Sequence, residues 1–161
     1  MSHICQYSSP RPATDAPIGK PTPVSQALLT HQSEHAPRLR FGPTKAKGRG
    51  VFACLPMAAG ELIEAVPVIV IPAEQWHHVE PTVLALYIFN FGPEGEHAAI
   101  ALGYGSLYNH SYLPNAEYAK SWEDRLIRFI ALRDIALGEE ITVNYNGTPG
   151  DRSPIWFEVS E

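Results

Sequence analysis

From Arg38 onward, short apolar runs alternate with glycine and proline residues, and few runs are long enough to form a helix of several turns. Runs of four to eight residues rich in valine, isoleucine and aromatic side chains, bounded by turn-forming residues, are typical of strands. The pattern therefore predicts a mainly β domain with few short helices. We expect strands at Leu39–Phe41, Gly50–Ala53, Glu61–Glu64, Val66–Ile71, Ala99–Leu102, Ala116–Lys120, Leu126–Ala131 and Ile141–Val143.

Three segments need separate treatment. The β-branched run Val66–Ile71 contains Pro67 and is followed by Pro72, which predicts a strand near a sheet edge because proline cannot donate to a strand ladder. Ala73–His78 is expected to form helical turns. Thr82–Phe89 fits helical turns and a strand equally, since its apolar residues follow neither period.

The first 36 residues have a different texture, with prolines at positions 10, 12, 17, 21 and 23. Such a segment buries too little apolar surface to offset the entropy lost on ordering, so we expect residues 1–36 to be a disordered arm and residues 37–161 to form the folded domain. Within the arm, Ser25–Ala36 could form a short helix capped by Ser25.

Composition narrows the classes further. The chain has 161 residues and a formal net charge of −5. No Lys/Arg stripe with interleaved aromatics is present, which argues against direct nucleic-acid binding, while a mildly acidic protein is compatible with a basic protein substrate. Two cysteines, Cys5 and Cys54, form neither a disulfide framework nor a zinc-ligand spacing. No apolar run reaches the roughly 20 residues of a membrane span, and no signal peptide is evident. We therefore expect a soluble cytoplasmic protein without a metal site, with nuclear residence or secretion into a host left open.

Polar, turn-forming residues interrupt the apolar sequence at Asn109–Asn115, which reads Asn-His-Ser-Tyr-Leu-Pro-Asn. Buried polar groups must find partners or bind a ligand, because leaving one unpaired costs roughly 1–3 kcal/mol. Gly138–Tyr145 predicts a turn and a strand that ends on a phenol. Lys47–Ala53 places two glycines at alternate positions before a strand, where the backbone can approach a ligand closely.

Two parts of the sequence also match motifs of other protein classes. Gly48-x-Gly50-x-x-Ala53 matches a dinucleotide-binding fingerprint, but that fingerprint needs a helix directly afterwards, and Leu55-Pro56 and Gly60 prevent one. His31-Gln32-Ser33-Glu34-His35 matches a zinc-peptidase motif. That motif needs a third ligand and a large catalytic scaffold, whereas this match lies at the edge of the proline-rich arm.

Taken in order, the segments at 47–53, 109–115 and 138–145 resemble the signature of SET-domain protein-lysine methyltransferases, and the resemblance runs from about Arg38 to Trp156. It implies small curled sheets around a threaded C-terminal segment. The chain resembles most the short members from bacteria and large algal viruses, which lack flanking zinc modules, and it has no cysteine after Cys54. The viral member acts on histone H3 as a dimer, so a histone or histone-like substrate and a homodimer are expectations here.

The resemblance also implies roles for individual residues. S-adenosyl-L-methionine would be the cofactor, the tyrosine that ends the third segment would be the catalytic residue, and aromatic side chains would wall a channel for the substrate lysine. Cofactor-binding residues by this resemblance are Lys47, Gly48, Arg49, Gly50, Ser106, Tyr108, Asn109, His110, Tyr145 and Trp156. Channel residues are Tyr87, Tyr118 and Tyr145, with Tyr145 also the catalytic residue.

Some side chains have ordinary structural explanations. A turn explains Asn115, and core packing is favoured for Tyr104 and Phe129. As an alternative function, the chain could be a catalytically silent SET module that binds a protein or peptide. Degenerate SET domains commonly lose the Asn-His pair or the final tyrosine, whereas Asn109, His110 and Tyr145 are all present here.

Overall fold

The computed structural model describes residues 37–159. The expected arm at 1–36, its possible short helix and the His31–His35 motif lie outside these residues. Among the described residues, no helix is long and apolar enough to cross a membrane, and no group of three or more His, Cys, Asp or Glu side chains is placed to hold a metal ion.

One sheet has four strands in the order β1-β2-β9-β6. Strands β1 (Leu39–Pro43), β2 (Arg49–Ala53) and β9 (Glu140–Val143) pair antiparallel, and the two-residue β6 (Asn109–His110) pairs parallel to β9. The sequence did not predict β6, because a polar Asn-His pair has no strand pattern. Its position beside β9 brings two of the polar segments together.

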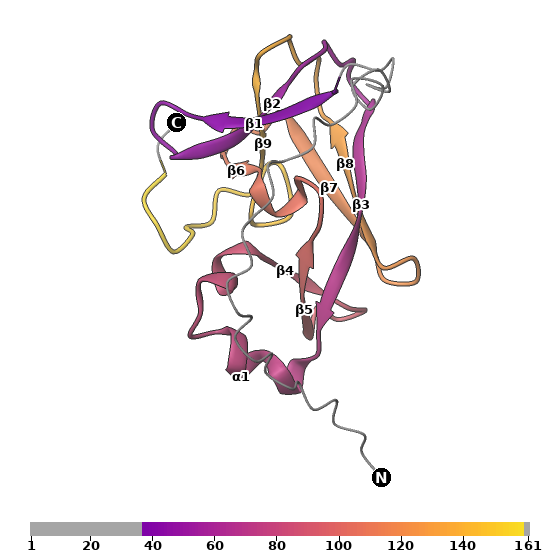
Figure 1. Ribbon diagram of the computed structural model, residues 1–161, viewed down its shortest axis with the longest axis vertical. Coiled ribbons are helices and arrows are strands. Elements are labelled where there is room, and N and C mark those ends of the chain that lie inside the picture. Colours follow the sequence, from indigo (N-terminus) through magenta and orange to yellow (C-terminus); the bar gives the residue numbers. More distant parts are fainter. Residues whose placement is uncertain (1–36, 160–161) are drawn as a thin grey trace, which may run out of the picture. The chain divides into compact units, whose positions relative to one another are not determined.

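The second sheet has five strands in the order β4-β5-β3-β8-β7. They are β3 (Leu62–Ile71), β4 (Ile88–Phe91), β5 (His97–Ala101), β7 (Ala116–Ser121) and β8 (Leu126–Ala131). The long strand β3 runs down one side of the domain, with β8 and β7 on one side of it and β5 and β4 on the other (Figure 1). The sheet curls so far that its two outer strands approach each other, and Lys120 Nζ of β7 donates a hydrogen bond to the Asn90 carbonyl of β4 at 2.9 Å.

The two strands expected at Glu61–Glu64 and Val66–Ile71 are one strand, and the prediction of an edge position for the second was wrong, since β3 is the middle strand. Pro67 is tolerated there because the pairing changes partner at this residue. Strand β3 pairs with β8 up to Pro67 and with β5 from Val68 onward. A missing N–H therefore falls where the ladder with one neighbour ends and the other begins.

Helical structure is confined to short pieces, as expected. A 3₁₀ turn (η2, Ala73–Gln75) and α1 (Trp76–Val79) account for the predicted turns at 73–78. The segment 82–89, which fitted helical turns and a strand equally, contains a 3₁₀ helix (η3, Val83–Tyr87) followed by the start of strand β4. Thr82 caps η3 by accepting a hydrogen bond from the Leu84 N–H. A last 3₁₀ turn, η4 (Gly105–Leu107), precedes β6.

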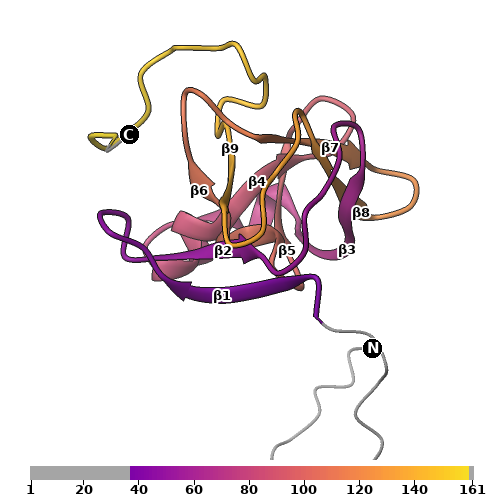
Figure 2. The ribbon, with the colours of Figure 1, turned by 90° about the horizontal axis from the view of Figure 1, so that it is seen from above.

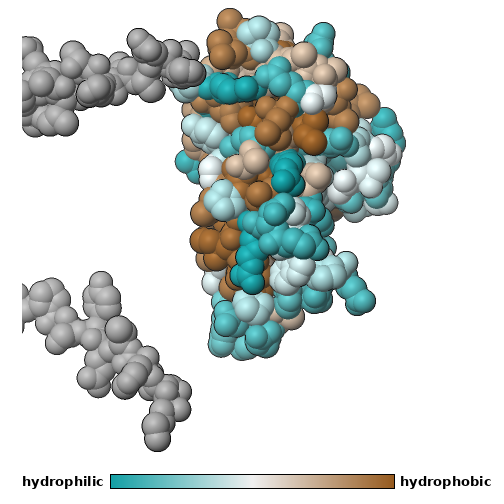
Figure 3. All heavy atoms as spheres, turned by 90° about the vertical axis from the view of Figure 1, so that its right-hand side faces the viewer, coloured by the Kyte–Doolittle hydropathy of each residue, from teal (hydrophilic) through white to brown (hydrophobic). Residues whose placement is uncertain are grey.

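The core lies between the sheets and consists mainly of alternate residues of β2, β3, β5, β8 and β9. Strand β8 shows the pattern clearly, because Ile127, Phe129 and Ala131 are buried and the residues between them are partly exposed. On the outside, apolar side chains gather into patches on the face that carries β3 and β8 (Figure 3). Strand β3 itself carries an exposed apolar side chain, Ile69.

Strand β9 is enclosed on both sides by earlier parts of the chain. Strand β2 pairs with one edge, and residues 109–115 cover the other: the Ser111 N–H donates to the Val143 carbonyl, and the Asn115 side chain bonds to β9 at two residues. The C-terminal segment continues from β9 as an open loop past β6 (Figure 2). This confirms small curled sheets around a late segment of the chain.

Candidate functional site

Tyr145 follows β9 and is fixed by the segment that contains β6. Its N–H donates to His110 Nδ1 at 3.1 Å, and its hydroxyl donates to the Tyr108 carbonyl at 2.8 Å. The parallel pairing of β6 with β9 produces this arrangement, since it places residues 108–110 beside residues 142–145. Burial above all, with electrostatic contributions from Tyr87, Glu140 and Tyr118, raises the pKa of Tyr145 to about 12. The phenol is therefore protonated at neutral pH and acts as a donor, not as a base.

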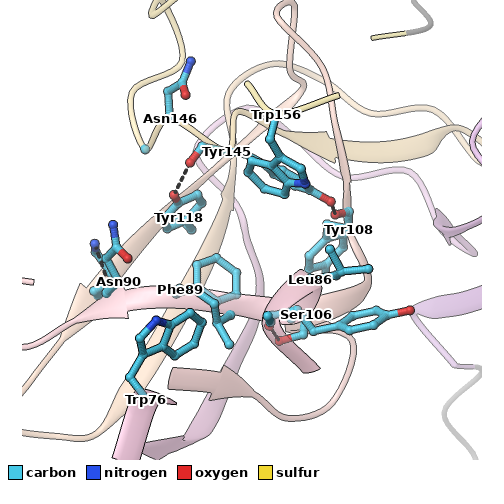
Figure 4. A pocket seen from close by; sticks show the side chains of 16 residues that line it. Trp76, Leu86, Phe89, Asn90, Ser106, Tyr108, Tyr118, Tyr145, Asn146 and Trp156 are labelled. Carbon is cyan, nitrogen blue, oxygen red and sulfur yellow. Dashed lines mark hydrogen bonds between the residues drawn. The ribbon is translucent and has the colours of Figure 1, made fainter. Parts of the chain in front are cut away.

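A cavity of about 440 Å³ opens beside Tyr145, and we call it the aromatic cavity. Its volume lies in the range of roughly 300–1,000 Å³ found for small-molecule sites. Figure 4 shows rings from separate elements facing it, with Trp76 and Phe89 on one side and Tyr145 and Trp156 on the other. The residues that line it are Trp76, Ala85, Leu86, Tyr87, Ile88, Phe89, Asn90, Gly105, Ser106, Tyr108, Tyr118, Lys120, Tyr145, Asn146, Gly147 and Trp156.

The aromatic cavity is held in shape by ring contacts and a few hydrogen bonds. Phe89 and Tyr118 meet edge to face with centroids 5.0 Å apart, and Phe89 also contacts Phe129 at 6.3 Å. The Tyr118 hydroxyl donates to the Tyr145 carbonyl at 3.4 Å, and the Ser106 hydroxyl donates to the Tyr87 carbonyl at 2.7 Å. Burial raises the pKa of Tyr118, so this phenol also stays neutral.

Trp156 closes one side of the aromatic cavity from the C-terminal segment. Its ring stacks on Tyr145 with a centroid distance of 5.9 Å and an angle of 20°, although 66 % of the residue is exposed. The segment that carries it is held back by side-chain amides: Asn144 donates to the Asp151 carbonyl at 2.6 Å, and Asn146 donates to the Ser153 carbonyl at 2.8 Å. Trp156, one of the cofactor-binding residues that the family resemblance implies, thus lies against Tyr145.

A second hollow of about 420 Å³, the polar hollow, is lined by Pro43, Thr44, Lys45, Ala46, Lys47, Phe52 and Glu140. It lies at the loop between β1 and β2. This loop is anchored to β6 by Lys47, whose Nζ donates to the His110 carbonyl at 3.0 Å. Residues 108–110 thus link the two spaces: Tyr108 lines the aromatic cavity, and Asn109 and His110 bond to residues of the polar hollow.

Asn109 is the central connection in this region. Its amide donates to the Arg49 carbonyl at 2.9 Å and to Glu140 Oε1 at 2.7 Å. Gly50 is required here because any Cβ at that position would come within 2.5 Å of Glu140 Oε1 and 2.9 Å of Asn109 Nδ2. Gly48 is required for a different reason, since its φ of +74° is in the left-handed region.

The structure brings together most of the residues singled out from the sequence. Ser106, Tyr108, Tyr87, Tyr118, Tyr145 and Trp156 line the aromatic cavity, while Lys47 lines the polar hollow and Gly48, Arg49 and Gly50 form the loop and strand beside it. Phe129 is fully buried in the core, and neither it nor Tyr104 lines the cavity, as expected. Asn115 has a structural role, but its side chain bonds to β9 rather than to a local turn.

Ten of the lining residues were not anticipated from the sequence, and four of these carry a side-chain nitrogen: Trp76, Asn90, Lys120 and Asn146. They come from elements that the curl of the five-stranded sheet and the return of the C-terminal segment bring together, so no local pattern marks them. Lys120 is the only lysine or arginine among the lining residues, and burial lowers the pKa of its amine. Another residue, Glu64, lies behind the cavity and bonds to Tyr108.

Comparison with known proteins supports one family. A family profile described as the SET domain matches residues 48–146. The histone-lysine N-methyltransferase, H3 lysine-37 specific, of Schizosaccharomyces pombe is 37% identical over 123 residues, which cover 74% of this chain and 77% of the relative.

Solved structures agree on the fold. A Plasmodium falciparum protein assigned as a histone methyltransferase matches with a TM-score of 0.54 and 27% identity, covering 68% of this chain and 98% of that one. Chaetomium thermophilum Polycomb Repressive Complex 2, in a humanized mutant bound to the inhibitor GSK126, matches with a TM-score of 0.58. At 22% identity, over 69% of this chain and 15% of that one, the second match speaks for the fold alone.

Proposed function

Because the chain belongs to the SET-domain family of protein-lysine methyltransferases, we propose that the polar hollow receives the methyl donor and the aromatic cavity receives the substrate lysine. Enzymes of this family generally use S-adenosylmethionine, and methyl transfer to a protein lysine is the activity of this chain. Residues 108–110 stand between the two spaces. Two reactants that approach from either side of one segment can be aligned in line, which displacement at a carbon atom requires.

The polar hollow has side chains of both charges, which suits a zwitterionic ligand. The Lys47 amine suits a carboxylate, and the Glu140 carboxylate suits an amino or hydroxyl group; S-adenosylmethionine carries all three. Gly50 brings the main chain close to Asn109 and Glu140, and Gly48 allows the preceding turn through its φ of +74°. We infer that Lys47, Gly48, Arg49, Gly50, Asn109 and His110 hold the cofactor, with Ser106, Tyr108, Tyr145 and Trp156 around its reactive end. When bound, it supplies a methyl group activated by a sulfonium.

The aromatic cavity suits the apolar stem of a lysine. Tyr87, Tyr118 and Tyr145 would surround that stem, and rings also tolerate the cationic methylated product through cation–π attraction. A lysine must lose its proton before it can attack, and its ordinary pKa is about 10.4. No carboxylate is among the lining residues, and the one amine there, Lys120, repels a second positive charge. Both features favour the neutral form of the incoming amine.

Tyr145 is the proposed catalytic residue, acting through orientation. Its hydroxyl is fixed on the Tyr108 carbonyl, and its ring lines the cavity and stacks on Trp156. A phenol whose pKa is about 12 gives no advantage as a base at neutral pH. We propose that Tyr145 and the Tyr108 carbonyl together position the reacting groups.

The substrate proposed is a histone or another basic protein. The S. pombe relative is named for lysine 37 of histone H3, and the net charge of −5 suits a basic partner. Residues 37–161 would form the catalytic domain, preceded by an arm at 1–36. A homodimer, and a cytoplasmic or nuclear location, complete the proposal and can be checked by light scattering and by imaging a tagged chain.

The fixed position of Tyr145 between the aromatic cavity and His110 is the observation that carries this function. Purified protein incubated with radiolabelled S-adenosylmethionine and purified core histones should label a histone band. Tyr145→Phe and His110→Ala should each lower labelling at least tenfold, since alignment contributes several kcal/mol to such reactions.

Tyr104→Phe and His78→Ala are the matched controls, because neither residue lines the cavity, and both should label as the unmodified protein does. If Tyr145→Phe and His110→Ala label normally, the site assignment is wrong. If the unmodified protein binds cofactor and histone but transfers nothing, the silent binding module is the better description.

A further inference from the structure

Behind the aromatic cavity, a carboxylate from β3 holds the residue on which Tyr145 depends. The Tyr108 hydroxyl donates to Glu64 Oε1 at 2.7 Å, across 44 residues of sequence. Tyr108 is 2 % exposed, and its ring packs on Phe129 with centroids 4.6 Å apart. The Glu64 contact therefore fixes the far end of a buried ring through a partly buried hydrogen bond.

The other end of the same residue faces the reaction. The Tyr108 main-chain carbonyl accepts the Tyr145 hydroxyl at 2.8 Å. Tyr108 is thus held at two points, by Glu64 through its phenol and by Tyr145 through its carbonyl. A shift of the Tyr108 ring would move the acceptor that orients the catalytic hydroxyl.

Besides the Tyr108 hydroxyl, the Glu64 carboxylate has a hydrogen bond with the Tyr104 main chain. No ion pair between residues 37 and 159 includes it. Gly103 fits against it only as a glycine, because φ is +61° there and a Cβ would lie 3.1 Å from Glu64 Oε2. Burial raises the pKa of Glu64 more than the hydrogen bonds with Tyr108 and the Tyr104 main chain lower it, so keeping an ionised carboxylate there costs free energy. That cost is understandable if the strong hydrogen bond to Tyr108 has a use beyond packing.

We propose that Glu64 is a positioning residue for methyl transfer: its carboxylate anchors the Tyr108 phenol, and this holds the Tyr108 carbonyl in place for the Tyr145 hydroxyl. The inference rests on the proposed function, because it assigns Glu64 a part in the same site. Glu64 lines neither the cavity nor the polar hollow, and its side-chain hydrogen bond toward the site is the one from Tyr108.

A set of four variants separates positioning from simple structural support. Glu64→Leu leaves the Tyr108 hydroxyl buried without an acceptor, and it should lower both the melting temperature and kcat, the latter on the order of tenfold, with KM for the histone nearly unchanged. Glu64→Gln retains an acceptor and should keep at least about half of kcat. Tyr108→Phe removes the donor and should lower kcat as Glu64→Leu does.

The double variant Glu64→Leu with Tyr108→Phe decides the question. Removing both partners of a buried hydrogen bond can be nearly neutral for stability, so its melting temperature should recover toward that of the unmodified protein. A positioning role predicts that kcat nevertheless stays about tenfold low. Recovery of kcat together with the melting temperature would show that Glu64 only supports the fold and would overturn the proposal.

Two further outcomes are decisive. Glu123→Leu, the same substitution at an exposed glutamate in the turn between β7 and β8, should leave kcat unchanged. Full activity of Glu64→Leu would reject the inference while leaving the proposed function intact. Failure of the unmodified protein to transfer any methyl group to core histones would reject both.

Discussion

The polar hollow and the aromatic cavity meet at residues 108–110 but are built in opposite ways. The polar hollow is held by hydrogen bonds from charged or amide side chains to the main chain, with Asn109 bonded to Arg49 and to Glu140. The aromatic cavity is held by ring contacts, such as Phe89 on Tyr118. Hydrogen bonds fix distances and directions closely, whereas ring packing fixes volume and excludes water.

This difference matches what each space would have to do. A cofactor with several charged groups needs partners at fixed positions, and a lysine stem needs a narrow apolar passage. The wall between the spaces combines both principles, because Tyr108 packs as a core aromatic and bonds through its carbonyl and its phenol. Substitutions on the two sides should therefore change different measured quantities.

The largest difference in cofactor affinity is expected between two Asn→Leu variants, one beside the polar hollow and one in the aromatic cavity. Asn109→Leu removes the donor to the Arg49 carbonyl and to Glu140, and it should weaken binding of S-adenosylhomocysteine about 30-fold, equivalent to roughly 2 kcal/mol. Asn90→Leu changes an amide that lines only the aromatic cavity, so cofactor affinity should stay within about twofold while KM for the histone rises. Calorimetry and steady-state kinetics measure the two effects.

Equal losses of cofactor affinity in both variants would contradict this separation. It would mean that the two spaces form one binding site. Circular dichroism of each variant checks that the fold is retained, which matters more for Asn109→Leu, because Asn109 lies in β6.

A smaller effect is expected where the aromatic cavity meets the C-terminal segment. Trp156→Ala removes the ring stacked on Tyr145 and should lower kcat/KM about fivefold, as expected for losing an aromatic contact of roughly 1 kcal/mol. The melting temperature should hardly change, because two thirds of Trp156 is exposed. Trp156→Phe should restore most of the activity, and a large loss of stability in Trp156→Ala would contradict the picture of a surface cover.

The sequence predicted where the strands lie in the chain better than it predicted which strands pair with each other. Alternating burial, as in β8, is a local property, and the predicted Leu126–Ala131 strand has the observed bounds. The pairing of β6 with β9 is not local. It depends on Asn115 and Ser111 bonding to β9 from another part of the chain, and only the family resemblance pointed to it.

The candidate site residues likewise fall into those that a local sequence pattern marks and those that only the fold brings together. Tyr145, Asn109 and His110 lie in recognisable segments, so the sequence singled them out as candidates. Lys120 and Asn90 were missed because they lie on the two outer strands of one sheet, and only its curl brings them together. Glu64 was missed because it interacts with the site through Tyr108 alone, and a single glutamate in a predicted strand carries no signal of that kind.

The smallest predicted effect contrasts two carboxylates, Glu139 next to β9 and Glu64 behind the aromatic cavity. Burial alone would raise the pKa of Glu139, which precedes β9, but Arg133, the Ala136 N–H and Asn115 together hold it below the ordinary value of 4.5. Glu64 shows the reverse, since burial outweighs the bond from Tyr108 and its pKa is raised above 4.5. The two groups should therefore give the free energy of unfolding opposite pH slopes.

The signs follow from proton binding. Near pH 4.5 the folded protein binds fewer protons at Glu139 than the unfolded chain does, so this contribution is complete above pH 4.5 and is lost as the pH falls. At Glu64 the folded protein keeps its proton longer, so a cost develops as the pH rises from 4.5 through the raised pKa. Urea unfolding between pH 4 and 7 should show that Glu139→Gln loses stability relative to the unmodified protein as the pH rises. Glu64→Gln should gain relative stability over the same range, each by less than about 1 kcal/mol. If the stability curves of both variants run parallel to that of the unmodified protein, the two carboxylates titrate as they do in the unfolded chain. The expected opposite pH slopes of Glu139 and Glu64 would then be wrong.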